Sequence, residues 1–319
     1  MIVSVKEQVI AMQDEIRKRI NELKQMLAKP IPAIDIGPYC DDPFTCDFHG
    51  HCWKHIPEYS VFDIGNLWTS KKFDLYYKGI TELKDIPEDS PLNDNQWMQV
   101  ECEINEKIVI EKGKLKEFKK QFQYPLYFLD FETFQSAIPL YDNSKPYQQI
   151  PFQYSLHVQK EKGGPIDHYE FLGTPPDDPR IPFIDSLISQ IETNGSIVVY
   201  NQGFETARLR EIARDFPQNE SQINKILNRI VDLMIPFHKR WYYTPAMKGS
   251  YSIKYVLPAL VPELSYQNLE IQEGGTASLI YESLYEDTDH ASVQTKRKNL
   301  LEYCKMDTLA MVMVLERIE

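Results

Sequence analysis

Two acidic residues, Asp130 and Glu132, directly follow the uninterrupted apolar segment 126–129. A short run rich in aromatic and apolar residues predicts a strand buried on both faces. Because side chains alternate across a strand, both carboxylates point to the same side at its carboxyl end. Two carboxylates there could hold a hard divalent cation. A surface turn is the alternative, because an Asp-x-Glu pair is common.

A third acid, Glu205, follows the apolar segment 196–200, which we expect to be another buried strand. Glu205 then lies in the first turn of a helix that ends near residue 215. If the two strands are parallel, this turn lies at the same sheet edge as Asp130 and Glu132. The alternative is that Glu205 only compensates the dipole of its helix.

A strong helix is expected over 298–318, with Tyr303 and Asp307 one turn apart on one face. The apolar stripe of the helix continues from this face. An aspartate beside a buried stripe must be paired, hydrogen-bonded or metal-bound, because an unpaired buried charge is costly. A rim acid at the edge of the stripe is the alternative.

Strands and helices in alternation would position these acids. The sequence predicts strands at 126–133, 150–158, 168–172 and 196–200, with helices at 181–191, up to 215 and at 298–318. This order indicates an α/β fold.

The amino-terminal part is expected to be mainly helical. An apolar stripe predicts an amphipathic helix over 5–27. A helical connector over 61–121 includes a helix at 97–108 and ends in a charged linker at 112–120.

Cys40, Cys46 and Cys52 lie within thirteen residues in a turn-rich loop. Such spacing in a cytosolic chain indicates a metal rather than disulfides. Zinc would take His49 or His51 as a fourth ligand, whereas an iron–sulfur cluster would need Cys102 or a cysteine outside this chain. Three buried free thiols are the alternative.

The composition limits the function classes. The chain has 319 residues, of which 42% are hydrophobic, and a formal net charge of −12. This charge argues against non-specific coating of duplex nucleic acid, which depends on Lys and Arg, but it leaves metal-dependent phosphate chemistry open. No apolar run approaches a membrane span and no signal peptide is evident, so we expect a cytoplasmic protein without a membrane partner.

The acidic motifs come in the order found in DEDD exonucleases. Asp130-x-Glu132, Asn201-x-x-Phe204-Glu205 and Tyr303-x-x-x-Asp307 resemble the DEDDy branch of the DnaQ-like, ribonuclease H-fold superfamily. This resemblance implies a ribonuclease H-like mixed sheet with flanking helices over 122–319. The second motif usually ends in aspartate, and Glu205 reaches about one methylene further.

A closer resemblance is to an uncharacterised bacterial family in which the exonuclease-like domain follows a RecB-like nuclease module with an iron–sulfur cluster. It is carried by the segments 150–157, 249–258 and 302–308. The cysteine loop resembles the tail of such a module, which places residues 1–60 in that tail, and no RecB-like nuclease core is evident in the chain. An upstream module in a longer protein is therefore an expected partner.

The resemblance implies 3′→5′ hydrolysis of single-stranded DNA or RNA ends by two Mg²⁺ or Mn²⁺ ions about 4 Å apart. Asp130, Glu132, Glu205 and Asp307 would bind the ions, and Tyr303 would orient the attacking water. Substrate contacts are expected from Phe134, Asn201 and Phe204, and cations from the tetrad 238–241. The alternative is a catalytically reduced module that binds nucleic acid or a partner.

Overall fold

The computed structural model describes residues 3–318, and the chain divides into two compact units. The first comprises Met1–Phe62 and Trp68–Glu82, and the second comprises Asp63–Leu67 and Leu83–Glu319. The three segments expected from the sequence, 1–60, 61–121 and 122–319, stay a prediction. None of the helices within 3–318 has both the length and the apolar character needed to cross a membrane.

The first unit contains one long helix, two short ones and a small core. Its helices are α1 (Lys6–Leu27), α2 (His49–Cys52) and α3 (Thr69–Tyr76). The helix predicted at 5–27 is confirmed as α1, and none of its residues is buried. Ile36, Cys40 and Phe73 form the core, against which the rings of Trp53 and Phe62 pack.

The second unit contains a mixed five-stranded sheet with the order β4-β3-β2-β5-β6. The central strand β2 pairs antiparallel with β3 and parallel with β5, and β5 pairs parallel with β6. The predicted α/β class is therefore confirmed, and the parallel pairing that the placement of Glu205 required is present. The strands are β2 (Leu126–Phe134), β3 (Ile150–Gln159), β4 (Ile166–Leu172), β5 (Ser196–Val199) and β6 (Ile230–Asp232).

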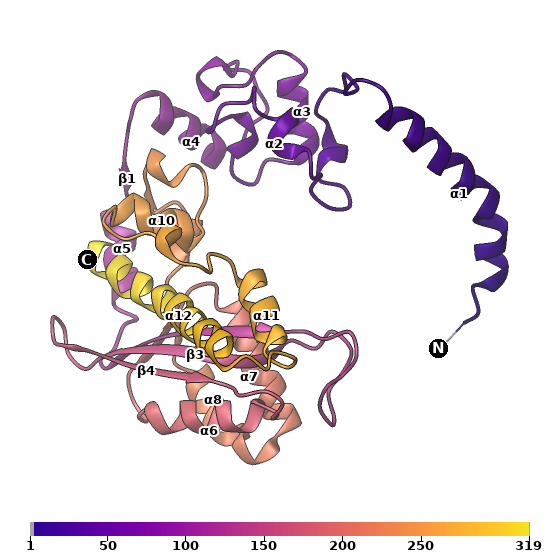
Figure 1. Cartoon of the computed structure of the whole chain (residues 1–319). Coiled ribbons are helices and arrows are strands. Elements are labelled where there is room, and N and C mark those ends of the chain that lie inside the picture. Colours follow the sequence, from indigo (N-terminus) through magenta and orange to yellow (C-terminus); the bar gives the residue numbers. More distant parts are fainter. Residues whose placement is uncertain (1–2, 319) are drawn as a thin grey trace. The chain divides into compact units, whose positions relative to one another are not determined.

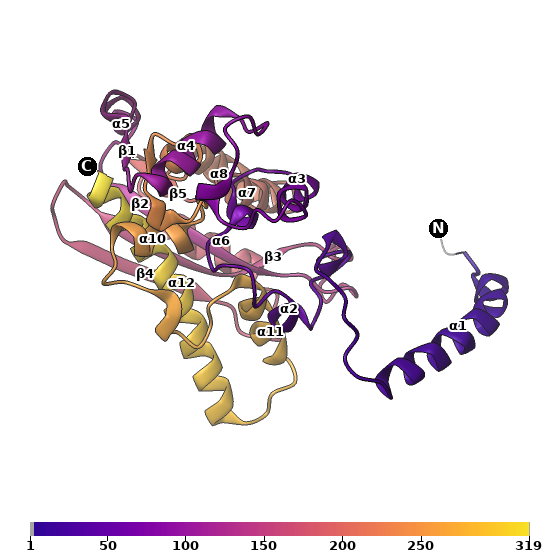
Figure 2. The same cartoon turned by 90° about the horizontal axis from the view of Figure 1, so that it is seen from above.

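Helices cover both faces of this sheet (Figure 1). On one face, α6 (Arg180–Gln190), α7 (Gly203–Asp215) and α8 (Glu220–Leu227) share a core with one set of alternating β2 side chains, Tyr127, Leu129 and Phe131. On the other face, α10 (Ile253–Leu260), α11 (Gly274–Ser283) and α12 (His290–Ile318) pack with Leu126 and Phe128. The long helix α12 lies against β2 and β3 (Figure 2).

Further elements of the second unit precede the first strand of the sheet in the sequence or follow its last strand. They are α4 (Asp94–Ile104), β1 (Val109–Ile110), α5 (Lys112–Lys119), α9 (Ile235–His238) and β7 (Tyr242–Tyr243). The short strands β1 and β7 pair with each other.

The prediction of a charged linker at 112–120 is wrong, because Lys112–Lys119 forms the helix α5. Leu115 and Phe118 lie three residues apart, on one face of a helix, and both are buried. Two buried apolar side chains are thus enough to fix this helix, although most of its other residues are charged.

Candidate metal centre

The central strand holds Asp130 and Glu132 on the side of the sheet covered by α12. Strand β2 pairs with β5 only over Leu126–Phe128, whereas its pairing with β3 continues through Asp130 and Glu132 and fixes the backbone where the two acids occur. The register with β3 shifts between Glu132 and Thr133. Such an irregularity redirects the side chains that follow it.

Asp307 on α12 joins the two strand acids. Ligand oxygens of Asp130, Glu132 and Asp307 all lie within 4.8 Å of one another. Throughout residues 3–318, this is the only group of three or more His, Cys, Asp or Glu side chains that is this compact. Glu132 is buried, whereas Asp130 and Asp307 are partly exposed, so an ion can reach the cluster from solvent.

Glu205 approaches the cluster from the first turn of α7. Its side chain is 2% exposed, and its Oε2 atom is buried without a hydrogen-bond partner in the described part of the chain. A buried carboxylate oxygen without a partner is expensive, and a cation would remove that cost. Glu205 lies outside the compact three-acid group, but its charge raises the pKa of Asp130 and of Glu132.

Burial raises the pKa of all four carboxyl groups, and repulsion from neighbouring cluster acids raises those of Asp130 and Glu132 further. The pKa of Asp130 is raised well above its ordinary value by burial and by its three acidic neighbours. Burial raises the pKa of Glu132 and of Glu205 to about 8 and that of Asp307 to about 6. Since a nearby cation favours the ionised forms, the donor set and its electrostatics fit a hard divalent metal.

Tyr266 contacts the cluster, and nothing in the sequence pattern indicated it. Its hydroxyl donates to Asp307 Oδ1 at 2.8 Å, which lowers the pKa of Asp307. The predicted site residue Tyr303 is buried next to it, with 6.5 Å between the two ring centroids. Within residues 3–318, Tyr303 bonds none of the cluster carboxylates.

Lys254 is the cation nearest to these two rings. Its Nζ atom lies 5.5 Å from the ring centre of Tyr303 and 5.8 Å from that of Tyr266, and it donates to Gln272 O at 2.5 Å. The positive charge lowers the pKa of Glu132 and Asp307, so Lys254 offsets part of the repulsion among the acids.

Asp232, at the end of β6, fixes the segment that leads into α7. Its carboxylate accepts hydrogen bonds from the backbone N–H groups of Asn201 at 3.0 Å, Gln202 at 3.1 Å and Met234 at 2.9 Å. Asn201 has a positive φ of 72°, and the two bonds hold the chain there. Asp232 therefore sets the position of Glu205, a role that sequence reasoning missed because β6 is only three residues long.

The predicted substrate residues have different environments. Asn201 is exposed and Phe204 is half-buried, with the Arg208 guanidinium 5.5 Å from the Phe204 ring centre. Both stay candidates. Phe134 does not fit its predicted role, because it is 1% exposed and packs against Phe152 and Tyr281 in the core.

The predicted cationic tetrad 238–241 is also corrected in part. Arg240 is 6% exposed, donates to Gly249 O at 2.6 Å and lies over the Tyr243 ring. A buried arginine with these internal partners stabilises the fold and does not present a charge to a ligand.

The three loop cysteines lie in the first unit. Cys40 is buried, Cys52 is half-buried and Cys46 is exposed, and the Cys46 N–H donates to Cys40 O at 2.8 Å. In this structure they do not form a compact ligand group of the kind found at Asp130. Cys102 is buried in the core of the second unit. A metal at the loop stays a prediction.

Comparisons with known proteins connect this geometry to a sequence family. Residues 127–252 match a domain of unknown function, DUF2779. The match covers Asp130, Glu132 and Glu205, whereas Tyr303 and Asp307 lie beyond it. No match was found among solved structures.

Curated relatives are also similar to this chain. An uncharacterized protein of Ureaplasma parvum serovar 3 is 28% identical over 271 residues, which is 75% of this chain and 37% of the relative. Uncharacterized proteins of Mycoplasma genitalium and Mycoplasma pneumoniae are 28% and 29% identical over 64% and 63% of this chain. The chain thus spans about a third of the length of these curated relatives.

Proposed function

We propose that this chain is a divalent-metal-dependent 3′→5′ exonuclease of the DEDDy type with a ribonuclease H-like fold. The observation that carries the proposal is the compact group of Asp130, Glu132 and Asp307, approached by the buried and unpaired Glu205. The four acids come from a central strand and two helices, in the order that the DEDDy resemblance implies.

The site fits Mg²⁺ or Mn²⁺, because these ions prefer oxygen ligands and the carboxylates need a cation to ionise together. Asp130, Glu132, Glu205 and Asp307 would hold the metal. When bound, two such ions supply an activated water molecule and stabilise the leaving oxygen in phosphodiester hydrolysis.

Tyr303 would orient the attacking water as a neutral hydroxyl. Burial and the adjacent acids raise its pKa above the ordinary value, so the phenol keeps its proton at neutral pH and can donate or accept a hydrogen bond without acting as a base. Asn201 and Phe204 would contact the terminal nucleotide of single-stranded DNA or RNA.

A second candidate function is a non-catalytic nucleic-acid-binding or partner-binding module. Glu205 favours this candidate function. It replaces the aspartate that is usual in the motif, and it lies outside the compact three-acid group. A RecB-like nuclease module elsewhere in a longer protein would then supply the chemistry, with the cysteine loop as its tail.

The test uses single-stranded DNA and RNA labelled at the 3′ or the 5′ end, with Mg²⁺ or Mn²⁺. We expect early release of the 3′ label and progressive shortening of the 5′-labelled strand. Asp130→Asn should abolish cleavage, while Asp142→Asn, an exposed acid outside the cluster, should leave it unchanged. If Asp130→Asn cleaves as fast as the unaltered chain, the catalytic proposal fails.

Metal binding separates the two candidate functions. In the catalytic chain, Mn²⁺ should raise the melting temperature, and Glu205→Gln should reduce both this rise and the cleavage rate. A non-catalytic module with a vestigial site would show neither cleavage nor a response to Mn²⁺.

A further inference from the structure

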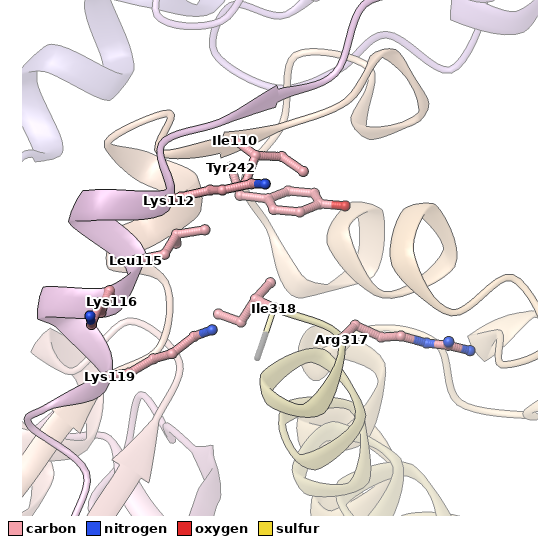
Figure 3. Close-up of a pocket in the computed structure, with 8 residues that line it drawn as sticks. All are labelled: Ile110, Lys112, Leu115, Lys116, Lys119, Tyr242, Arg317 and Ile318. Carbon is pink, nitrogen blue, oxygen red and sulfur yellow. The ribbon is translucent and has the colours of Figure 1, made fainter.

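A groove with positively charged walls lies in the second unit, apart from the acidic cluster. Its volume is about 480 Å³, and none of its lining residues is one of the four acids. Figure 3 shows the groove between α5, the β1–β7 pair and the end of α12. It is lined by four cationic side chains, Lys112, Lys116, Lys119 and Arg317, and four apolar or aromatic ones, Ile110, Leu115, Tyr242 and Ile318.

The three lysines form a stripe along α5. Their spacing of four and then three residues places them on one face of the helix. In Figure 3, Lys112 extends toward Tyr242 and Lys119 toward Ile318, whereas Arg317 extends away from the lysines. Arg317 pairs with Glu263 at 2.8 Å, so Arg317 is not available as an uncompensated charge in the groove.

Lys112 and Lys116 differ from other charged residues of this segment in having no ion-pair partner in the described part of the chain. Neither forms an ion pair or a side-chain hydrogen bond with any residue in 3–318, although both are exposed. By contrast, Lys114 and Lys120 pair with Glu111 and Glu117 on the same segment. Two uncompensated lysines side by side, on a chain with a net charge of −12, indicate a site for an anion.

The remaining lining favours a nucleic acid strand over a small anion. Tyr242 and Ile110, which pair in the β1–β7 ladder, offer an aromatic ring and an aliphatic surface beside the lysines. Single-stranded nucleic acid is bound by this combination, because cations contact the phosphates while bases stack on aromatic rings.

Helix α12 connects the groove to the acidic cluster. Ile318 follows Asp307 by three turns of the same helix, so the two side chains share a face at a separation of about 16 Å. A strand that reaches both places must therefore extend over more than one nucleotide step.

We propose that the groove of α5, Tyr242 and Ile318 binds the phosphate backbone of a single strand whose 3′ end lies at the acidic cluster. The groove contacts lie more than one nucleotide step from that end. The position of the 3′ end rests on the proposed function, whereas binding of the strand in the groove does not.

The experiment measures binding of fluorescent oligothymidylate to the full chain in EDTA, where no hydrolysis can occur. The test variant is Lys112→Gln with Lys116→Gln, and the matched control is Lys114→Gln with Lys120→Gln, which removes the same charge from the same segment. A twenty-nucleotide strand should bind about tenfold more weakly to the test variant. The slope of log affinity against log salt should fall by about 1.4, since each lost phosphate contact contributes about 0.7 for single strands.

Hydrolysis of substrates of different length places the groove relative to the 3′ end. The test variant should degrade a twenty-nucleotide strand with a raised KM, but cleave a dinucleotide, which is too short to reach the groove, as fast as the unaltered chain. The groove proposal is overturned if the test and control variants bind the long strand equally. If neither variant nor the unaltered chain hydrolyses any strand, yet the test variant alone loses binding, the proposed function fails and the groove stands.

Discussion

Two tyrosine hydroxyls lie at the acidic cluster, and they have different chemical surroundings. Tyr266 donates to Asp307 Oδ1, whereas Tyr303 has no such bond within the described chain. A hydrogen bond to a carboxylate favours its ionised form. We therefore assign Tyr266 to the control of proton and metal affinity at Asp307, and Tyr303 to the reacting water.

Tyr266→Phe should raise the pKa of Asp307 above its present value of about 6. A hydrogen bond to a charged group contributes roughly 1.5–3 kcal/mol, and one pKa unit is about 1.4 kcal/mol. The pH at which the Mn²⁺-induced rise in melting temperature is half complete should thus move upward by about one unit. Thermal denaturation with and without Mn²⁺ between pH 5 and 9 measures this midpoint.

Tyr303→Phe is the matched control, because it removes a hydroxyl from the same site without removing a bond to Asp307. It should leave the pH midpoint unchanged and lower the rate of hydrolysis. Identical midpoints for Tyr266→Phe and the unaltered chain would show that the Tyr266 bond has no influence on Asp307.

At the level of the elements, Asp232 at the end of β6 fixes the position of the backbone at the start of α7. The carboxylate satisfies three backbone N–H groups, and nothing in an alanine side chain can replace it. Asp232→Ala should cost about 2–4 kcal/mol in the free energy of unfolding. It should also weaken the Mn²⁺ response, because Glu205 loses its fixed position. Urea denaturation at pH 7 measures the first effect.

Glu220→Gln provides a comparison, since Glu220 is an exposed acid in the first turn of α8. It should change the free energy of unfolding by no more than about 0.5 kcal/mol. If Asp232→Ala is equally mild, the three backbone bonds do not hold the start of α7.

The strands that carry the site were predictable from local sequence, and several of its contacts were not. The apolar run before Asp130 predicts a buried strand, because β2 is covered on both faces. The place of Glu205 followed from the parallel pairing of β2 and β5. Tyr266 belongs to a three-residue 3₁₀ turn, which has no periodic signal, and its bond to Asp307 spans 41 residues.

Two predictions, the linker at 112–120 and the substrate contact of Phe134, were wrong because they depended on long-range contacts. The many charged residues of 112–120 predict a linker, but Leu115 and Phe118 are buried, and Phe118 belongs to a core that is built mostly from distant segments. Phe134 was expected to contact the terminal nucleotide of the substrate. The register shift after Glu132 and the packing of α11 against β2 place it in the core.

For the whole molecule, the raised carboxyl pKa values make stability depend on both pH and metal. Glu132 and Glu205 have pKa values of about 8 in the folded state, against roughly 4.3 in an unfolded chain. Above pH 4.3 the unfolded state has released protons that the folded state still binds, so the metal-free protein loses stability as pH rises through 8.

The prediction applies between pH 6.5 and 9. Burial lowers the pKa of His157 to about 3 and that of His168 to about 4, so these residues destabilise the fold only below pH 6.5. In EDTA, the free energy of unfolding should fall by several kcal/mol from pH 6.5 to 9. Saturating Mn²⁺ should reverse the fall, as measured by denaturant titration at each pH.

Glu132→Gln combined with Glu205→Gln should make the EDTA curve less steep, because two of the titrating groups are gone. A slope that is the same in the double variant and in the unaltered chain would mean that these glutamates do not cause the pH dependence.

The contact between Cys304 and Asp130 spans 174 residues of sequence, and this separation has a consequence during protein synthesis. At about 5–20 residues per second, a ribosome needs roughly 10–35 seconds to pass from the first acid of the site to α12. During that time the nascent chain carries Asp130, Glu132 and Glu205 without the helix that supplies Asp307. A chain whose translation stops before α12 would therefore lack the complete acid cluster.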